Sequence, residues 1–83
     1  MLEKEESQRI KVYSTKKRFG KLVTVVEGLD KEVLEKTAKE LKHRLACGGT
    51  VKNGVVVLQG DHKNKMKGLL VGMGYSQESI TIR

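Results

Sequence analysis

The sequence has 83 residues, of which 37% are hydrophobic and 33% are charged. A chain of this length buries roughly 60–65% of its unfolded surface, which suffices for a single small domain with a thin core. No apolar run approaches the ~20 residues of a membrane-spanning helix, and acidic residues stand where a signal peptide is basic. We therefore expect a cytoplasmic protein without a membrane partner.

The charge is strongly basic and unevenly distributed. The net charge is +7, to which the first eight residues contribute −2 and residues 9–83 contribute +9. The segment Arg9–Lys21 contains six basic residues and no acidic one. Such an acid-free cluster favours a polyanionic partner, most simply nucleic acid. The alternative is a merely soluble, well-charged surface.

Residues that could support catalysis or metal binding are sparse. Cys47 is the one cysteine, which excludes an internal disulfide and fits a reducing compartment. Only His43 and His62 could join it as zinc ligands, too few for a structural site. Cys47, His62 and Asp61 contain the letters of a thiol triad, but no spacing supports one, and no phosphate-binding glycine motif is present. We therefore expect no enzyme activity, no metal and no cofactor.

The first predicted element is a long hairpin. From Arg9 the pattern alternates, with Ile10 and Val12 on one face, as in a half-buried strand. A β-branched, nearly continuous apolar run at 22–26 predicts a second and more central strand. The basic segment between them then forms the hairpin tip, where Gly20 could supply a positive φ.

A helix is predicted directly after this hairpin, with Asp30 as its N-cap. Apolar and small residues recur at helical spacing over three turns; they are Val33, Leu34, Thr37, Ala38, Leu41 and Leu45. Three acid–base pairs lie four residues apart with the acid first, the stabilising orientation; they are Glu32–Lys36, Glu35–Lys39 and Glu40–Arg44. The Gly48–Gly49 pair is expected to end the helix in a left-handed conformation.

A second hairpin and a second helix follow. Asn53-Gly54 is a strong short hairpin signal, and the apolar run 55–58 after it is typical of a strand that is central or buried on both sides. Asp61 is placed as the N-cap of the helix. Its buried face and its end are formed by Met66, Leu69, Leu70, Met73 and Gly74. Gly68 and Gly72 inside this helix each destabilise it by about 1 kcal/mol relative to Ala. We expect that close packing on the sheet requires residues this small.

Residues 79–83 alternate again and predict a last strand. The element order is therefore ββαββαβ. Two helices in so short a chain can both cover one face of one sheet. This predicts an α+β two-layer sandwich, with a mixed β-sheet and both helices on one face. We place this single domain at 9–83 and a flexible acidic arm at 1–8, which is polar and aperiodic.

The basic hairpin tip is the first candidate binding surface. Lys and Arg can contact RNA phosphates, Arg18 can also reach base edges, and Phe19 offers a ring for stacking on a base. The alternative is an ordinary solvated loop in which Phe19 folds back onto the sheet. Four like charges on one tip repel unless a partner neutralises them, which favours binding. The candidate residues are Lys16, Lys17, Arg18, Phe19, Gly20 and Lys21.

Two further basic groups lie on the predicted helices. The first helix carries Lys36, Lys39, Lys42, His43 and Arg44 on its outer face. Acidic residues four positions earlier can neutralise three of them, so this face could simply be solvated. His62 and Lys63 begin a basic group at the start of the second helix, where the helix dipole disfavours cations. That position suggests a further contact with a polyanion.

Two segments of the sequence, Ala46-Cys47-Gly48-Gly49-Thr50-Val51 and Leu58-Gln59-Gly60-Asp61-His62, are spaced as in the Sui-type translation initiation factors. The tip Lys17-Arg18-Phe19-Gly20-Lys21 and the segment Glu27-Gly28-Leu29-Asp30 extend the similarity. Residues 9–83 therefore closely resemble this family, which comprises eukaryotic and archaeal initiation factor one and their bacterial relatives. The residues in these segments resemble those of archaeal members.

This resemblance implies a role on the small ribosomal subunit near the P site, where the factor promotes accurate start-codon selection. It also implies rRNA contacts through the hairpin and the first helix. By match, these contacts fall on Lys16, Lys17, Arg18 and Lys21 in the hairpin and on Lys39, Lys42 and Arg44 in the helix. Initiator tRNA and other initiation factors are further candidate partners, and a monomer is expected.

Other functions are compatible with the same resemblance. The Asn53-Gly54 turn is shorter than the loop of eukaryotic members that is thought to face initiator tRNA. The domain also occurs in factors that recycle or re-initiate, so a small-subunit RNA-binding regulator in stress, recycling or re-initiation is the first alternative. The second is a protein-interaction module that uses a bare sheet face, with Tyr13 or Thr81 in contact with the partner.

Overall fold

The computed structural model of the protein describes residues 9–83, apart from the side chain of Arg18. It contains the strands β1 (Ile10–Lys16), β2 (Leu22–Glu27), β3 (Gly49–Lys52), β4 (Val55–Gln59) and β5 (Ile80–Ile82), the helices α1 (Lys31–Leu45) and α2 (Lys63–Gly72), and the 3-10 turns η2 (Arg18–Gly20) and η3 (Gln77–Ser79). The predicted order ββαββαβ is confirmed. The predicted acidic arm lies outside the described residues. Within residues 9–83 no helix is both long enough and apolar enough to span a membrane.

The strands form one five-stranded sheet in the order β3-β4-β2-β1-β5. Neighbouring strands are antiparallel except β1 and β5, which are parallel. The sheet is therefore mixed, and β2 lies at its centre, both as predicted. The central position explains why most residues of β2 are apolar, with Thr24 as the one interruption of its run from Leu22 to Val26.

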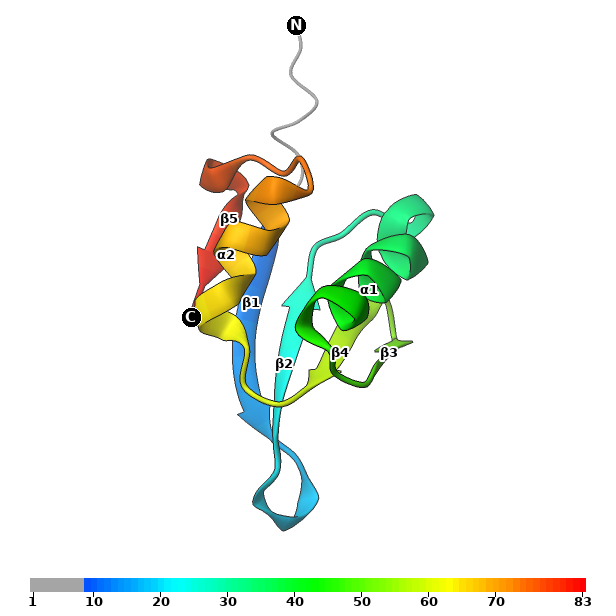
Figure 1. Ribbon diagram of the computed structural model, residues 1–83, viewed down its shortest axis with the longest axis vertical. Coiled ribbons are helices and arrows are strands. Elements are labelled where there is room, and N and C mark those ends of the chain that lie inside the picture. The colour runs from blue at the N-terminus through cyan, green and yellow to red at the C-terminus, as the bar shows by residue number, and fades with distance from the viewer. Residues whose placement is uncertain (1–8) are drawn as a thin grey trace, which may run out of the picture.

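Both helices cover the same face of this sheet, as Figure 1 shows. Helix α1 packs on β3 and β4, and α2 packs on β1 and β5. Between the layers lies a core of fully buried side chains, among them Ile10, Val12, Val26, Leu41, Val56, Leu58, Met66 and Leu70. The predicted α+β two-layer sandwich is confirmed, and no helix within residues 9–83 lies on the opposite face of the sheet.

Burial alternates along β3 and β4 because one face is covered and the other is open, whereas in the central strand β2 Val23 and Val25 are buried on the helix-free face as well. In β4, Val56 and Leu58 are fully buried against the helices, whereas Val55 and Val57 are half-buried. The strand is interior to the sheet, as expected, but it is not buried on both sides. An interior strand of this sheet can therefore contain a continuous apolar run although no second layer of helices covers its other face.

Two turns have the backbone geometry that their residues favour. Asn53 and Gly54 both have positive φ, 53° and 80°, which is the geometry of a type I′ hairpin turn. Gly28 follows β2 with φ of 94°, and a Cβ at this position would lie 1.9 Å from the carbonyl oxygen of Arg9. Only glycine allows the chain to pass so close to the start of β1.

Helix α1 ends differently from the prediction in its details, whereas α2 ends as predicted, with Gly74 at φ of 106° just after it. At the end of α1 the left-handed residue is Ala46 (φ 52°), and neither Gly48 nor Gly49 has positive φ. The amide of Ala46 bonds to the carbonyl of His43 and that of Cys47 to the carbonyl of Lys42, a Schellman motif. These two hydrogen bonds satisfy the terminal carbonyls and hold Ala46 in place.

The helix starts agree with the prediction only in part. Asp30 occupies the N-cap position of α1, but its side chain forms no capping hydrogen bond. The N-cap of α2 is His62, not Asp61. The Asp61 carboxylate instead accepts a hydrogen bond of 2.7 Å from the Ser14 hydroxyl of β1, which the sequence separation of 47 residues concealed.

Two predicted local interactions are absent. A Cβ at Gly68 or Gly72 would meet nothing within 4 Å, so these glycines do not pack on the sheet and the prediction was wrong. Of the three predicted ion pairs on α1, whose side chains are all described, only Glu40–Arg44 forms, at 2.6 Å. Exposed pairs at this spacing are worth a few tenths of a kcal/mol, too little to hold every long side chain in place.

Candidate nucleic-acid interface

The β1–β2 hairpin extends beyond both covering helices (Figure 1). Its last strand pair is Lys16 opposite Leu22, after which the amide of Lys17 bonds to the carbonyl of Lys21 at 2.7 Å. The turn η2 then reverses the chain with positive φ at Phe19 (63°) and Gly20 (74°). Gly20 therefore has the predicted conformation, which glycine adopts freely, whereas Phe19 is strained by its positive φ.

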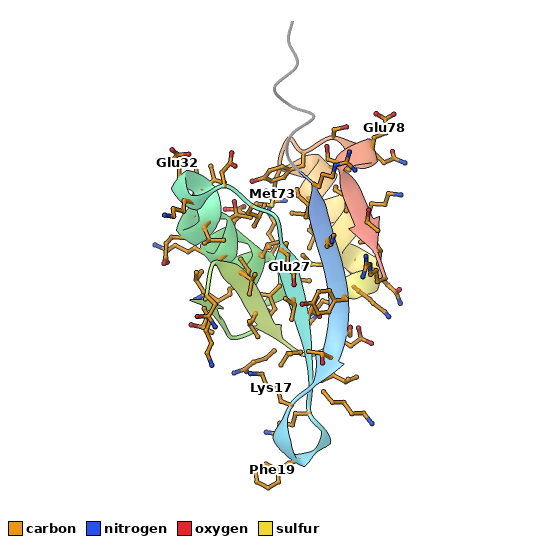
Figure 2. The ribbon with its side chains drawn as sticks, turned by 180° about the vertical axis from the view of Figure 1, so that it is seen from behind. Lys17, Phe19, Glu27, Glu32, Met73 and Glu78 are labelled. Carbon is orange, nitrogen blue, oxygen red and sulfur yellow. The ribbon has the colours of Figure 1, made fainter. Side chains whose placement is uncertain are left out.

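Phe19 is 93% exposed and lies at the far end of the hairpin (Figure 2). The alternative in which its ring folds back onto the sheet is therefore wrong. The side chains of Lys16, Lys17 and Lys21 are also exposed. The tip thus combines an accessible aromatic ring with at least three accessible cations, which suits phosphate contact and base stacking.

Helix α1 presents a second row of cations beside the edge strand β3. Lys36, Lys39 and Lys42 line a groove of about 650 Å³ together with Glu35 of the same helix and with Gly49 and Thr50 of β3. The Lys42 ammonium lies 3.4 Å from the carbonyl oxygen of Gly49, to which it donates. The sequence placed Lys36 in the basic group of this helix but expected it to be paired with Glu32; that pair does not form, so Lys36 is a free member of the row.

The hairpin and the α1 row meet at β3. A second groove of about 610 Å³, lined by Lys17 and Lys21, includes the same Gly49 and Thr50. We call the five lysines around these two grooves the lateral basic surface; they are Lys17, Lys21, Lys36, Lys39 and Lys42. The structure therefore joins two groups that lie some 20 residues apart in the sequence.

Arg44 does not belong to the lateral basic surface. Its guanidinium binds the Glu40 carboxylate at 2.6 Å, and both residues line a different groove with His43 and Leu69 of α2. This groove lies on the side of α1 that faces α2. Arg44 is thus separated from Lys39 and Lys42, although all three are on one helix.

His62 and Lys63 are also apart from the lateral basic surface and have internal partners. The His62 ring lies 2.6 Å from the carbonyl oxygen of Gln59, and its backbone amide donates to the Thr24 hydroxyl at 2.8 Å. The Lys63 ammonium donates to the carbonyl of Arg83 at 3.2 Å. Their place at the start of α2 therefore has a structural explanation.

Two titratable groups near these surfaces have shifted pKa values. The Ser14 hydroxyl, and secondarily the backbone and charge of Lys63, lower the pKa of Asp61. Burial raises the pKa of the Cys47 thiol, which packs at the edge of the core. A thiol kept protonated is a poor nucleophile.

The residues that the structure describes do not form a metal-binding group. Across residues 9–83, no three His, Cys, Asp or Glu side chains gather closely enough to hold a metal ion. The chemistry of the described surface is therefore that of exposed ammonium groups, one exposed aromatic ring and backbone groups at a sheet edge.

Comparison with known proteins places this architecture in a family. Residues 6–76 match the family described as "Translation initiation factor SUI1". The chain is 52% identical over 80 residues to a protein translation factor SUI1 homolog of Pyrococcus furiosus, covering 94% of this chain and 82% of the relative. It is 54% identical over 81 residues to a homolog of the same name from Methanocaldococcus jannaschii, covering 95% and 79%. A third, from Methanosphaera stadtmanae, is 50% identical over 80 residues, covering 94% and 79%.

The chain belongs to the SUI1 family of translation initiation factors. The family resemblance inferred from the sequence is thereby confirmed, including its archaeal character. Translation initiation is the process in which this protein takes part.

Proposed function

We propose that the protein binds the small ribosomal subunit near the P site and promotes accurate start-codon selection, without a catalytic step. The observation that carries this proposal is the lateral basic surface together with the hairpin tip. The tip projects exposed cations and Phe19 away from the body of a molecule that measures 47 × 22 × 22 Å. A narrow basic projection of this kind can enter a cleft between RNA elements.

Start-codon discrimination would follow because the hairpin tip and a correctly paired initiator tRNA cannot occupy the same space. The hairpin tip occupies its place near the P site while initiator tRNA is loosely bound there. Correct codon–anticodon pairing then draws the tRNA into the volume that the tip occupies. Because the factor then binds one state of the ribosome better than the other, its release is coupled to pairing. Initiator tRNA and other initiation factors are partners in this scheme, and the protein acts as a monomer.

The assigned rRNA contacts differ in how freely their side chains can bind. Lys16, Lys17, Arg18 and Lys21 contact phosphates at the hairpin, where Gly20 shapes the turn and Phe19 stacks on a base. Lys39 and Lys42 contact phosphates from α1. Arg44, His62 and Lys63 are assigned peripheral contacts, because each already has a partner within the protein.

Equilibrium binding to purified small subunits across a salt series tests the proposal. We expect affinity to fall steeply with salt, and the triple change Lys16→Ala, Lys17→Ala, Arg18→Ala to make the logarithmic slope shallower by about 2–3 units. A matched triple change at exposed lysines outside the site, Lys11→Ala, Lys31→Ala and Lys52→Ala, should leave the slope nearly unchanged. Equal effects of the two triple variants would contradict a specific role of the tip.

Dissociation from small subunits that carry initiator tRNA separates start-codon selection from the alternative roles. We expect faster release when the mRNA presents a matching start codon than when it presents a mismatched one. The tip triple variant should lose most of this difference. A recycling or stress factor would dissociate at the same rate with either codon.

A further inference from the structure

The face of the sheet that carries no helix has a distinct composition. Alternation along the strands directs Ile10, Val12, Val26, Val56 and Leu58 to the covered face, so their neighbours point the other way. Cations on this open face include Lys11, Lys17, Lys21, Lys52 and, at the end of β5, Arg83. Glu27 is its one carboxylate in the described chain, and it lies near the middle of the sheet in Figure 2, where it accepts a hydrogen bond from the Tyr13 hydroxyl.

One end of the open face, beside the hairpin base, is hollowed. This is the groove of about 610 Å³ introduced above, a volume within the ~300–1,000 Å³ typical of small-ligand sites. Its apolar part includes Val23 and Val57 of two neighbouring strands. Lys17 and Lys21 also line it, and Figure 2 places Lys17 between the sheet and the hairpin tip.

Gln59 adds a polar group to the same groove. Its side-chain amide lies over Gly48, where a Cβ would be only 2.9 Å from the amide oxygen. The backbone of the two residues is joined by a 2.8 Å hydrogen bond. Among the side chains that the structure describes, none forms a hydrogen bond with this amide group, so its donor and acceptor can bind a ligand.

The apolar floor, the free side-chain amide and the two lysines of this groove together match the chemistry of one class of ligand. The two lysines fit a phosphate, the valine floor fits the flat face of a base, and a side-chain amide can pair with a base edge. An acidic peptide would satisfy the lysines but would leave the valine floor and the amide without matching groups. A base in a duplex cannot reach such a groove, because its faces are stacked and its edge is paired.

We infer that this groove binds one unpaired nucleotide of RNA. The base lies on Val23 and Val57, its edge bonds to the Gln59 amide, and its phosphate lies between Lys17 and Lys21. The inference rests on the proposed function, since it names the kind of RNA element that meets the protein beside the hairpin: an extruded or single-stranded nucleotide.

Amide chemical shifts of the full chain, recorded during titration with RNA, test the assignment directly. Hexa-adenylate should shift the amides of Val23, Thr50 and Val57, whereas a six-base-pair RNA duplex should shift hairpin amides and leave these three unmoved. We expect the single strand to bind about tenfold more tightly than the duplex at equal salt. Equal shifts with the duplex would overturn the inference. Equal shifts and affinity with a hexa-aspartate peptide would assign the groove to an acidic protein instead.

A pair of glutamine variants tests the role of the amide. Gln59→Leu should weaken hexa-adenylate binding at least about fivefold, and Gln77→Leu, at another exposed glutamine, should not change it. Unchanged affinity of Gln59→Leu would contradict the assigned contact. Amide spectra report whether each variant is folded, and the titration of the unaltered chain stands without them.

Small-subunit binding measured in parallel separates this inference from the proposed function. If the protein binds small subunits but hexa-adenylate leaves the groove amides unmoved, the nucleotide site is wrong and the proposed function stands. If hexa-adenylate occupies the groove but small subunits are not bound, the proposed function fails and the groove remains an RNA site.

Discussion

Ala46 is a residue whose backbone is in a conformation that its side chain disfavours. It has φ of 52° at the end of α1, held there by the two hydrogen bonds of the Schellman motif. A left-handed conformation costs a non-glycine residue about 1–2 kcal/mol, whereas glycine adopts it freely. Gly48 and Gly49, which attracted the prediction of the helix end, lie two and three residues further along the chain.

Ala46→Gly should therefore stabilise the protein. We expect a gain of about 0.5–1 kcal/mol in the free energy of unfolding, after the greater flexibility of glycine in the unfolded chain is subtracted. Urea denaturation measures it. Ala38→Gly, at a buried position within α1, is the control and should destabilise by more than 1 kcal/mol. A less stable Ala46→Gly protein would mean that the left-handed conformation is not strained.

Ser14→Ala should raise the pKa of Asp61 toward the ordinary value of an aspartate. The Ser14 hydroxyl is the main cause of the lowered pKa, because it donates to the ionised carboxylate. The stabilisation linked to this shift is present above the ordinary aspartate pKa and is lost as pH falls through the lowered value. Titration of the Asp61 carboxyl by NMR measures the change. An unaltered pKa in the variant would assign the shift to Lys63 instead.

Cys47→Ser should leave small-subunit binding unchanged. The thiol packs at the edge of the core, and burial raises its pKa, so it is not poised to act as a nucleophile. Binding assays on the serine variant, with its folding checked by circular dichroism, measure the effect. A folded variant that no longer bound would show that Cys47 takes part in function.

At the scale of elements, the glycines of the sheet and of α2 have opposite roles. A Cβ at Gly49 would lie 2.7 Å from the carbonyl oxygen of Val57, so this residue must remain small for β3 to pair with β4. At Gly68 and Gly72 a Cβ would meet nothing within 4 Å. Identical residues in similar sequence surroundings thus differ in what tertiary structure demands of them.

Gly68→Ala should stabilise the protein by about 0.5–1 kcal/mol, and Gly72→Ala, at the last residue of α2, by less. Gly49→Ala should destabilise it by at least about 1 kcal/mol, because the strand must shift to admit the methyl group. Thermal unfolding of the three variants measures these differences. Destabilisation by Gly68→Ala would contradict the open surroundings of that residue.

Those parts of the candidate site that lie on a single structural element were predictable from the sequence. The hairpin tip was identified from the acid-free run of cations, and Gly20 from the need for a positive φ. The sequence did not predict the side of α1 to which each of its cations points. Lys36, Lys42 and Arg44 all fit an exposed helix face, but α1 directs two of them toward β3 and the third toward α2.

For the molecule as a whole, charge repulsion is only weakly compensated. Residues 9–83 contain 16 basic and 7 acidic side chains. Among the described side chains, one salt bridge within 4 Å is formed, between Arg44 and Glu40. The excess cations are concentrated at the hairpin and beside β3, where they repel one another in the folded state.

Thermal stability should therefore rise when salt is added. We expect the Tm to increase by a few degrees between 10 and 300 mM sodium chloride, because the Debye length falls from ~30 Å to about 6 Å and screens the repulsion. Replacement of Lys17 and Lys21 by Ala should raise the Tm at low salt and reduce its salt dependence. Scanning calorimetry measures both. A Tm that falls with salt would mean that attractive pairs dominate.

The sequence by itself determined the order of elements, the type of sheet, the helix-covered face and the position of the basic tip. These follow from periodicity, from turn residues and from a local excess of charge, which act over a few residues. Only the tertiary structure decided which distant groups come together: Ser14 with Asp61, the hairpin lysines with those of α1 across β3, and Gln59 with Val23 in one groove. Strand register and helix rotation place these side chains, and both depend on the packing of the entire core.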